Sequence, residues 1–219
     1  TSAGNVGVGE SAAIDAKLHV TTADSGGTFH SQADEIGLEG SGHTGINILS
    51  GTRSEGSIYF GDSGDNNIGR IVYDHNANNL QVYTNATEAM RIDSTGAVTK
   101  PLQPAFLTYL GSTISDIAIN TNLTVAFNNE IIDANADYDT SAYTFTAPVT
   151  GKYQFNLLLR LNNVDTASSY YQVYVITSNR NYTFTFEPNF STDVDYHNVT
   201  LANLAVMDAS DTAYVRVYQ

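Results

Sequence analysis

The first hundred residues contain strand patterns that are too short and too polar for one chain to cover. Groups of Gly, Asn, Asp and Ser separate the patterns, as in "GDSGDNN" from Gly61 and "HNANN" from His75. These residue types favour turns, so the segment predicts a meander of small hairpins. Alternating apolar residues mark the expected strands: Val6 and Val8, Leu18 and Val20, Ile36 and Leu38, Ile46 and Ile48, Ile58 and Phe60, Ile71 and Tyr73, Leu80 and Val82, and Ala89, Met90 and Ile92.

So few apolar side chains bury little area within a single chain. Apolar burial contributes about 25 cal/mol per Å², whereas ordering the backbone costs about 1–2 kcal/mol per residue. A monomer of residues 1–100 is therefore expected to be marginal or unfolded. Identical chains that wrap around a common threefold axis would share one apolar core and close their exposed strand edges. We therefore expect residues 1–100 to form the β-rich shaft of a homo-oligomeric fibre, with a homotrimer favoured.

A domain boundary is predicted at residues 101–104. Pro101 and Pro104 lack the backbone donor of a strand ladder and keep the preceding residues extended, which suits a stiff linker. From residue 105 the strands become longer, more aromatic and better alternated. In "KYQFNLLLRL", for example, Tyr153 and Phe155 begin an apolar face that continues at every second residue. The spacing of these strands and their turns predicts an all-β chain whose residues 105–219 form an antiparallel jelly-roll sandwich.

The composition argues against several classes of function. The 219 residues carry nine Lys and Arg against 23 Asp and Glu, and the formal net charge of −14 would repel a phosphate backbone. Nucleic-acid binding is therefore not expected. The chain has no cysteine, so packing or association has to hold it together. No apolar run approaches the ~20 residues of a membrane span, and no membrane insertion is expected. The sequence opens without the regions of a signal peptide, and we interpret it as a fragment.

The second half of the chain resembles a known family. The stretch "NLTVAFNNEIIDANADYDTSAYTFTAPVTGKYQFNLLLRL", residues 122–161, is similar to the globular head of complement subcomponent one-q, one of the tumour-necrosis-factor-like jelly rolls. Farther on, Asp211 and Val215 match the family's late turn and strand, while Ser210 stands where a Gly is usual. The positions that carry the resemblance are Asn128, Tyr138, Phe145, Pro148, Gly151, Tyr153 and Phe155.

This resemblance implies a ten-stranded jelly roll that trimerises through its inner faces. The family ends with a further strand, commonly aromatic and Gly-rich, whereas this sequence stops at Gln219. We therefore expect the head to lack its last strand through truncation of the sequence.

The first half resembles phage tail-fibre and related virion-appendage proteins. Two stretches carry this resemblance: "GNVGVGESAAIDAKLHV", residues 4–20, and "IYFGDSGDNNIGRIVYDHNANNLQVYTNATEAMRIDSTGAV", residues 58–98. Glu10 replaces the usual Thr, and the turn after it lacks the usual Pro. The resemblance implies a location on the virion surface, outside the cell, and other virion structural proteins as partners.

Residue types that perform chemistry are scattered along the chain. "GDSGDNN" and "DANADYD" could supply oxygen ligands for Ca²⁺, although turns capped by their own carboxylates explain them as well. We therefore expect no metal, no other cofactor and no enzymatic activity. The histidines lie in no ligand spacing, and five of the glutamates are isolated in sequence. They are His19, His30, His43, His75 and His197, and Glu39, Glu55, Glu88, Glu130 and Glu187.

Aromatic residues in the second half are the candidates for recognition. Half or more of them should pack the sandwich or a trimer interface, and the remainder would give exposed, rigid contact area. The loops "NNVDTASSYY" and "TSNRNYTF" should lie at a rim of the sandwich. They could bind a receptor there, or they could serve solubility alone. The predicted receptor-binding residues are Tyr170, Tyr171, Asn179, Arg180 and Tyr182.

These observations together predict a viral structural fibre protein, a phage appendage whose trimeric head attaches to a host surface glycan or protein. Three weak sites on one trimer would act together and raise the avidity. Two alternatives stay open at this point. The protein could decorate the capsid or assist assembly without a receptor, or it could cleave surface polysaccharide.

Overall fold

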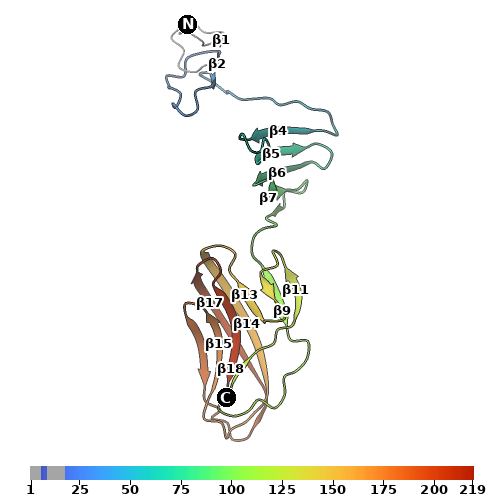
Figure 1. Ribbon diagram of the computed structural model, residues 1–219, viewed down its shortest axis with the longest axis vertical. Helices are drawn as coiled ribbons and strands as arrows, with labels where there is room; N and C mark the ends of the chain where they lie inside the picture. Colours follow the sequence, from blue (N-terminus) through green and yellow to red (C-terminus); the bar gives the residue numbers. More distant parts are fainter. Residues whose placement is uncertain (1–5, 9–17) are drawn as a thin grey trace. The chain divides into compact units, whose positions relative to one another are not determined.

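The computed structural model describes residues 6–8 and 18–219, and every regular element in this part of the chain is a β-strand (Figure 1). The expected all-β class is therefore confirmed. The chain divides into two compact units, Thr1–Gln81 and Val82–Gln219. In the described residues no helix is long and apolar enough to cross a membrane.

The first three strands form a parallel sheet. β1 (Val6–Val8) pairs with β2 (Leu18–Thr21), and β2 pairs with β3 (Ile36–Glu39), both in parallel. The expectation of hairpins is wrong for this segment, because a tight hairpin joins antiparallel strands. Parallel strands need a connection of a dozen residues or more, and residues 22–35 between β2 and β3 supply one.

A five-stranded sheet follows in chain order, and here the expected meander is confirmed. Its order is β4-β5-β6-β7-β8, and the β4–β5 and β7–β8 pairs are antiparallel. The turns around it use Asn78, Asn85 and Ala86 at positive φ, which Asn tolerates better than most residues. The strands are β4 (Glu55–Phe60), β5 (Gly69–Asp74), β6 (Asn79–Thr84), β7 (Thr87–Ile92) and β8 (Val98–Thr99).

One expected strand does not form. Ile46 and Ile48 alternate as in a strand, but residues 43–51 belong to no strand, and Figure 1 draws the chain between β3 and β4 as a long plain trace. Both isoleucines are exposed, at 71% and 46%. Residues 43–51 lie next to the edge strand β4 at Ile48 but form no strand ladder with it, so the pattern alone did not produce a strand.

The predicted linker lies between sheets, since β8 ends at Thr99 and β9 begins at Phe106. The boundary between the compact units falls earlier, within β6. The expected domain boundary at residues 101–104 stays a prediction.

The second half contains ten strands in the arrangement of a sandwich. One sheet has the order β12-β13-β18-β15-β16, with β10 also paired to β18; the remaining strands form the pairs β14–β17 and β9–β11. The strands are β9 (Phe106–Tyr109), β10 (Asn122–Thr124), β11 (Asn129–Asp133), β12 (Tyr138–Asp139), β13 (Thr144–Thr146), β14 (Gly151–Val164), β15 (Tyr171–Thr177), β16 (Asn181–Phe186), β17 (Val194–Met207) and β18 (Thr212–Tyr218).

Alternation along the strands places the core between the two layers. Leu157 and Leu159 of β14 are buried and pack with Val173 and Val175 of β15 in one cluster, together with Val217 of β18. The residues between the two leucines and beyond them face outward, as the period of two requires. The antiparallel jelly-roll sandwich expected for residues 105–219 is therefore confirmed.

A second cluster is aromatic and centres on β9. The Phe106 ring stacks on Tyr138 and on Phe145, each with ring centroids 5.1 Å apart. The Tyr138 hydroxyl donates to the Phe127 carbonyl oxygen at 3.1 Å. Burial raises the pKa of Tyr138 to about 12.

The raised pKa of Tyr138 makes the stability of the head dependent on pH. Between the ordinary pKa near 10 and the raised value near 12, the folded state binds the phenol proton more tightly than the unfolded state does. The free energy of unfolding is therefore expected to fall with rising pH in this window, by up to about 1.4 kcal/mol per pH unit. Urea unfolding from pH 9 to 12 measures it. Tyr138→Phe should show a shallower decline, and equal slopes for both proteins would contradict the prediction.

Candidate functional site

The structure does not bring the predicted receptor-binding residues together. Tyr170 precedes β15, whereas Asn179 and Arg180 lie in the turn that follows β15. A seven-residue strand at about 3.3 Å per residue separates the two groups by roughly 20 Å. The two rim loops therefore belong to opposite ends of the sandwich.

Two of the predicted residues are packing residues. Tyr171 is only 3% exposed, stacks on Phe186 with ring centroids 5.2 Å apart, and its hydroxyl accepts a bond from the Asp165 backbone N–H at 2.9 Å. Tyr182 is half-buried against the core, and its hydroxyl donates to the Leu204 carbonyl oxygen at 3.3 Å. The expectation that Tyr171 is an exposed contact residue is corrected, because strand alternation turns it inward with Val173.

Asn179 and Arg180 are exposed, but local bonds hold their turn. The Asn179 side-chain amide donates to Asp211 Oδ2 at 2.6 Å, which ties this turn to the one between β17 and β18. The Arg180 backbone exchanges bonds with Thr177. These contacts hold the turn in place and link it to the neighbouring turn. Its role in receptor binding stays a prediction.

Tyr170 belongs to a continuous row of polar and aromatic side chains on the other face of the six-stranded sheet. Its ring stacks on Tyr218 with centroids 5.4 Å apart. The register of β15 and β18 pairs Gln172 with Tyr218, Tyr174 with Arg216, and Ile176 with Tyr214. We call Tyr170, Gln172, Tyr174, Tyr214, Arg216 and Tyr218 the outer stripe.

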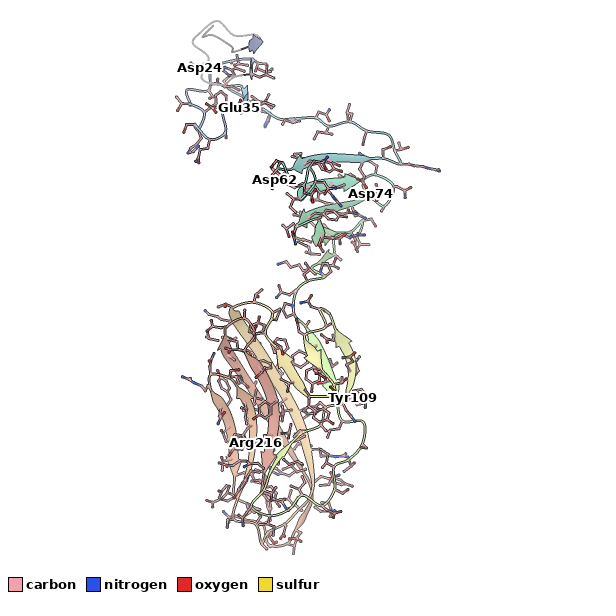
Figure 2. All side chains as sticks on the ribbon, in the orientation of Figure 1. Asp24, Glu35, Asp62, Asp74, Tyr109 and Arg216 are labelled. Atoms are coloured by element: carbon pink, nitrogen blue, oxygen red, sulfur yellow. The ribbon has the colours of Figure 1, made fainter. Side chains whose placement is uncertain are left out.

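Arg216 is the cation of the outer stripe, and Figure 2 labels it within the head. Its guanidinium carbon lies 4.8 Å from the centre of the Tyr174 ring, a cation–π distance. The Tyr174 hydroxyl donates to the Gln172 side-chain oxygen. The Nε atom of Arg216 is buried, and no hydrogen-bond partner meets it among the described residues.

Tyr218 is held in its neutral form. The hydrogen bond with Tyr170 raises its pKa above the ordinary value, and burial together with the negative charges that Tyr170 and Tyr174 would carry when ionised acts in the same direction. Its hydroxyl donates to Asn120 Oδ1 at 3.1 Å. At neutral pH the outer stripe therefore offers phenol rings and hydroxyls beside one positive charge.

The outer stripe is suited to recognition. Tyrosine rings give flat apolar area for a sugar ring or an aliphatic side chain, and their hydroxyls give directional bonds. Tyr and Arg are also the residue types that dominate binding energy at interfaces. The sheet holds these side chains in place, so binding would cost little conformational entropy.

The acidic turns use their carboxylates for their own backbone. Asp62 Oδ1 accepts bonds from the N–H groups of Gly64 and Asp65, and hydrogen bonding lowers the pKa of Asp62. Asp133 accepts bonds from the backbone N–H groups of Asp137 and Tyr138. Within residues 18–219, no group of three or more His, Asp or Glu is arranged to hold a metal ion.

Of the six residues in the outer stripe, sequence reasoning predicted Tyr170 and missed the other five. Tyr214, Arg216 and Tyr218 alternate in "TAYVRVYQ", and this alternation was the available signal. The residues between them are also apolar, so the pattern could not show which set faces outward.

Similarity to known proteins is found among solved structures. No family model and no curated protein matches the chain. Among solved structures, the chain is similar to the globular domain of the zebrafish complement 1qA protein, with 19% identity and a TM-score of 0.41. The match covers 53% of this chain and 80% of that one.

The Tyr170–Tyr218 pair yields a direct test of the stripe geometry. Tyr170→Phe keeps the stacked ring but removes the hydroxyl that raises the Tyr218 pKa. The Tyr218 pKa is expected to move down toward 10 in the variant, as measured by NMR of ring-labelled tyrosine during a pH titration. An unchanged Tyr218 pKa would show that the two hydroxyls are not coupled.

Proposed function

We propose that this protein is a structural fibre protein of a virion surface, a phage appendage, and that its head attaches to a host surface glycan or protein through the outer stripe. The observation that carries the proposal is the row of tyrosines with Arg216 on the rigid sheet of the head. The earlier resemblance of residues 4–20 and 58–98 to fibre shafts suggests the viral setting.

Exposed apolar side chains support association of identical chains. Leu158, Leu204 and Val206 are 72%, 56% and 64% exposed on the outward face of the β14–β17 pair. We call these three residues the outer apolar face. Such a group of exposed large apolar residues is typical of an interaction surface. A homotrimer would cover it in each copy.

The five-stranded sheet supports the same interpretation. Ile58, Tyr59 and Phe60 of β4 are 45%, 52% and 56% exposed, although they are consecutive residues of one strand. β4 is also the edge of its sheet. An exposed apolar edge invites pairing with another chain, and a shared shaft core would satisfy it.

Association would give attachment its strength. Three tethered copies of a weak site raise the avidity by about 10²–10⁴ without new contacts. The net charge of −14 would keep the fibre from adhering unspecifically to anionic envelopes.

The oligomeric state is tested by light scattering on the purified chain. A homotrimer has three times the chain mass of 23.6 kDa at all concentrations measured. Leu204→Glu should weaken association at least about 100-fold, because it buries an unpaired charge in the interface. Thr183→Glu, an exposed position on β16, is the matched control and should leave the mass unchanged. A wild-type monomer with a cooperative melt would contradict the proposed trimer.

Attachment is tested with labelled protein on immobilised bacterial envelope and on purified surface polysaccharides. Arg216→Ala is expected to lower binding at least about tenfold, since Arg residues in such surfaces are frequent centres of binding energy. Arg180→Ala, in the turn that follows β15 and outside the outer stripe, should leave binding unchanged. Binding that depends on Arg180 and not on Arg216 would overturn the assignment to the outer stripe. Release of reducing sugar would indicate an enzyme, and binding to virion proteins alone would indicate an assembly role.

A further inference from the structure

Arg216 carries a positive charge that no carboxylate beside it balances. The strands of its sheet, β10, β12, β13, β15, β16 and β18, hold no other Lys or Arg, and their one acidic residue is Asp139. Asp139 lies on the edge strand β12, two strands away from β18, which is about 10 Å at the usual strand spacing. Its carboxylate accepts bonds from the backbone N–H groups of Ser141 and Ala142. Among the described residues, Arg216 forms no ion pair.

Uncharged polar side chains surround Arg216 on the outward face of the sheet. Residues paired across antiparallel strands share a face, and Arg216 pairs with Tyr174 on one side and with Thr124 on the other. Thr183 of β16 continues this row beyond Tyr174. Phenols, amides and hydroxyls therefore lie around a single cation. The next row across the same four strands consists of Thr185, Gln172, Tyr218 and Asn122.

The end of the Arg216 side chain is open to a ligand. Its Nε atom is buried, but its two terminal nitrogen atoms are neither buried nor bonded within the described part of the chain. Two N–H donors in one plane match the two oxygen atoms of a carboxylate, and such charged bonds are about twice as strong as neutral ones. The exposed hydroxyls of Thr124 and Thr183 on either side suit the hydroxyls of a sugar.

The outer stripe has the dimensions of a site for several sugar units. Tyr214 and Tyr218 are four residues apart on β18, which corresponds to about 13 Å along the strand. Their rings offer flat faces on which sugar rings can pack. An extended peptide would bind through a free strand edge, but β15 and β18 are each paired on both sides. The stripe therefore favours a polysaccharide over a peptide.

We propose that the outer stripe binds an acidic polysaccharide, with the carboxylate of a uronic acid unit on Arg216 and neighbouring sugar rings on Tyr174 and Tyr218. The inference rests on the proposed function and names the class of glycan. The net charge of −14 does not prevent this contact, because exposed charges more than about 8 Å apart are largely screened at physiological salt. The same charge would repel the polysaccharide from the rest of the surface, so binding is directed to the stripe.

Calorimetry with soluble oligosaccharides tests the class of ligand at each single head, whatever the oligomeric state. The probes are fragments of polygalacturonate, alginate and hyaluronan, each before and after reduction of its carboxylates to alcohols. At least one acidic probe is expected to bind, and reduction should weaken its binding at least about tenfold. Equal binding after reduction would overturn the proposal, as would tighter binding of dextran sulfate than of any uronate.

A substitution opposite Arg216 tests the position of the charge. Thr124→Glu supplies a carboxylate from the chain itself, since paired residues have Cβ atoms about 4.5–5.5 Å apart. It should weaken binding of the acidic probe at least about tenfold, as Arg216→Gln should. Thr124→Gln has the same shape without the charge and should bind as the wild type does. Equal affinities of the Glu and Gln variants would overturn the proposal.

A matched control exists on the other sheet of the sandwich. Arg160 of β14 also lies over a tyrosine ring, with its guanidinium carbon 5.2 Å from the centre of the Tyr196 ring. Arg160→Gln removes the same charge and should leave the affinity for the acidic probe unchanged. If the head binds bacterial envelope through Arg216 but no acidic probe, the acidic class is overturned while the proposed function stands. If it binds neither envelope nor probe, both fail.

Discussion

The ladder between β14 and β17 is the constraint on which the head depends. Its register runs without interruption from the Gly151–Met207 pair to the Leu161–His197 pair, so that two long strands present one continuous apolar face. That face buries Leu157, Leu159 and Val199 against the valines of the opposite sheet. Burying each such side chain contributes about 1.5–3 kcal/mol, and the alternation that achieves it also decides which residues face outward.

The two outer surfaces of the sandwich differ in chemistry because of this packing. The outward face of the β14–β17 pair carries Leu158, Leu204 and Val206, whereas the outward face of the β15–β18 pair carries tyrosines and Arg216. Exposed large apolar side chains suit association, and a row of phenols with one cation suits recognition. One scaffold therefore separates the surface proposed for assembly from the surface proposed for attachment.

The first half of the chain lacks such a ladder. Its strands are short, and Val72 is the apolar side chain of the five-stranded sheet that is buried almost completely. Side chains on β4 that would be core residues in a larger domain stay exposed. Among the described residues, the exposed edge of β4 and the groove lined by β9 and β14 are places where backbone or apolar groups lack a strand partner. Association of chains would pair the free backbone groups and bury the apolar side chains at each of them.

The amino-acid sequence by itself determined the strands and the class of fold. Alternation such as that of "KYQFNLLLRL" has a period of two, which only an extended strand converts into one apolar face, and turn residues marked where strands end. Tertiary structure decided which side of a strand faces the core and which strands pair, because alternation alone specifies neither. Tyr170 and Tyr171 are neighbours of the same type, yet one stacks on the surface and the other is 3% exposed, because the start of β15 on the sheet sets their direction. In the same way, β2 and β3 pair in parallel, the segment with Ile46 and Ile48 forms no strand, and a groove is lined by β9 and β14, since pairing depends on which edges meet in space.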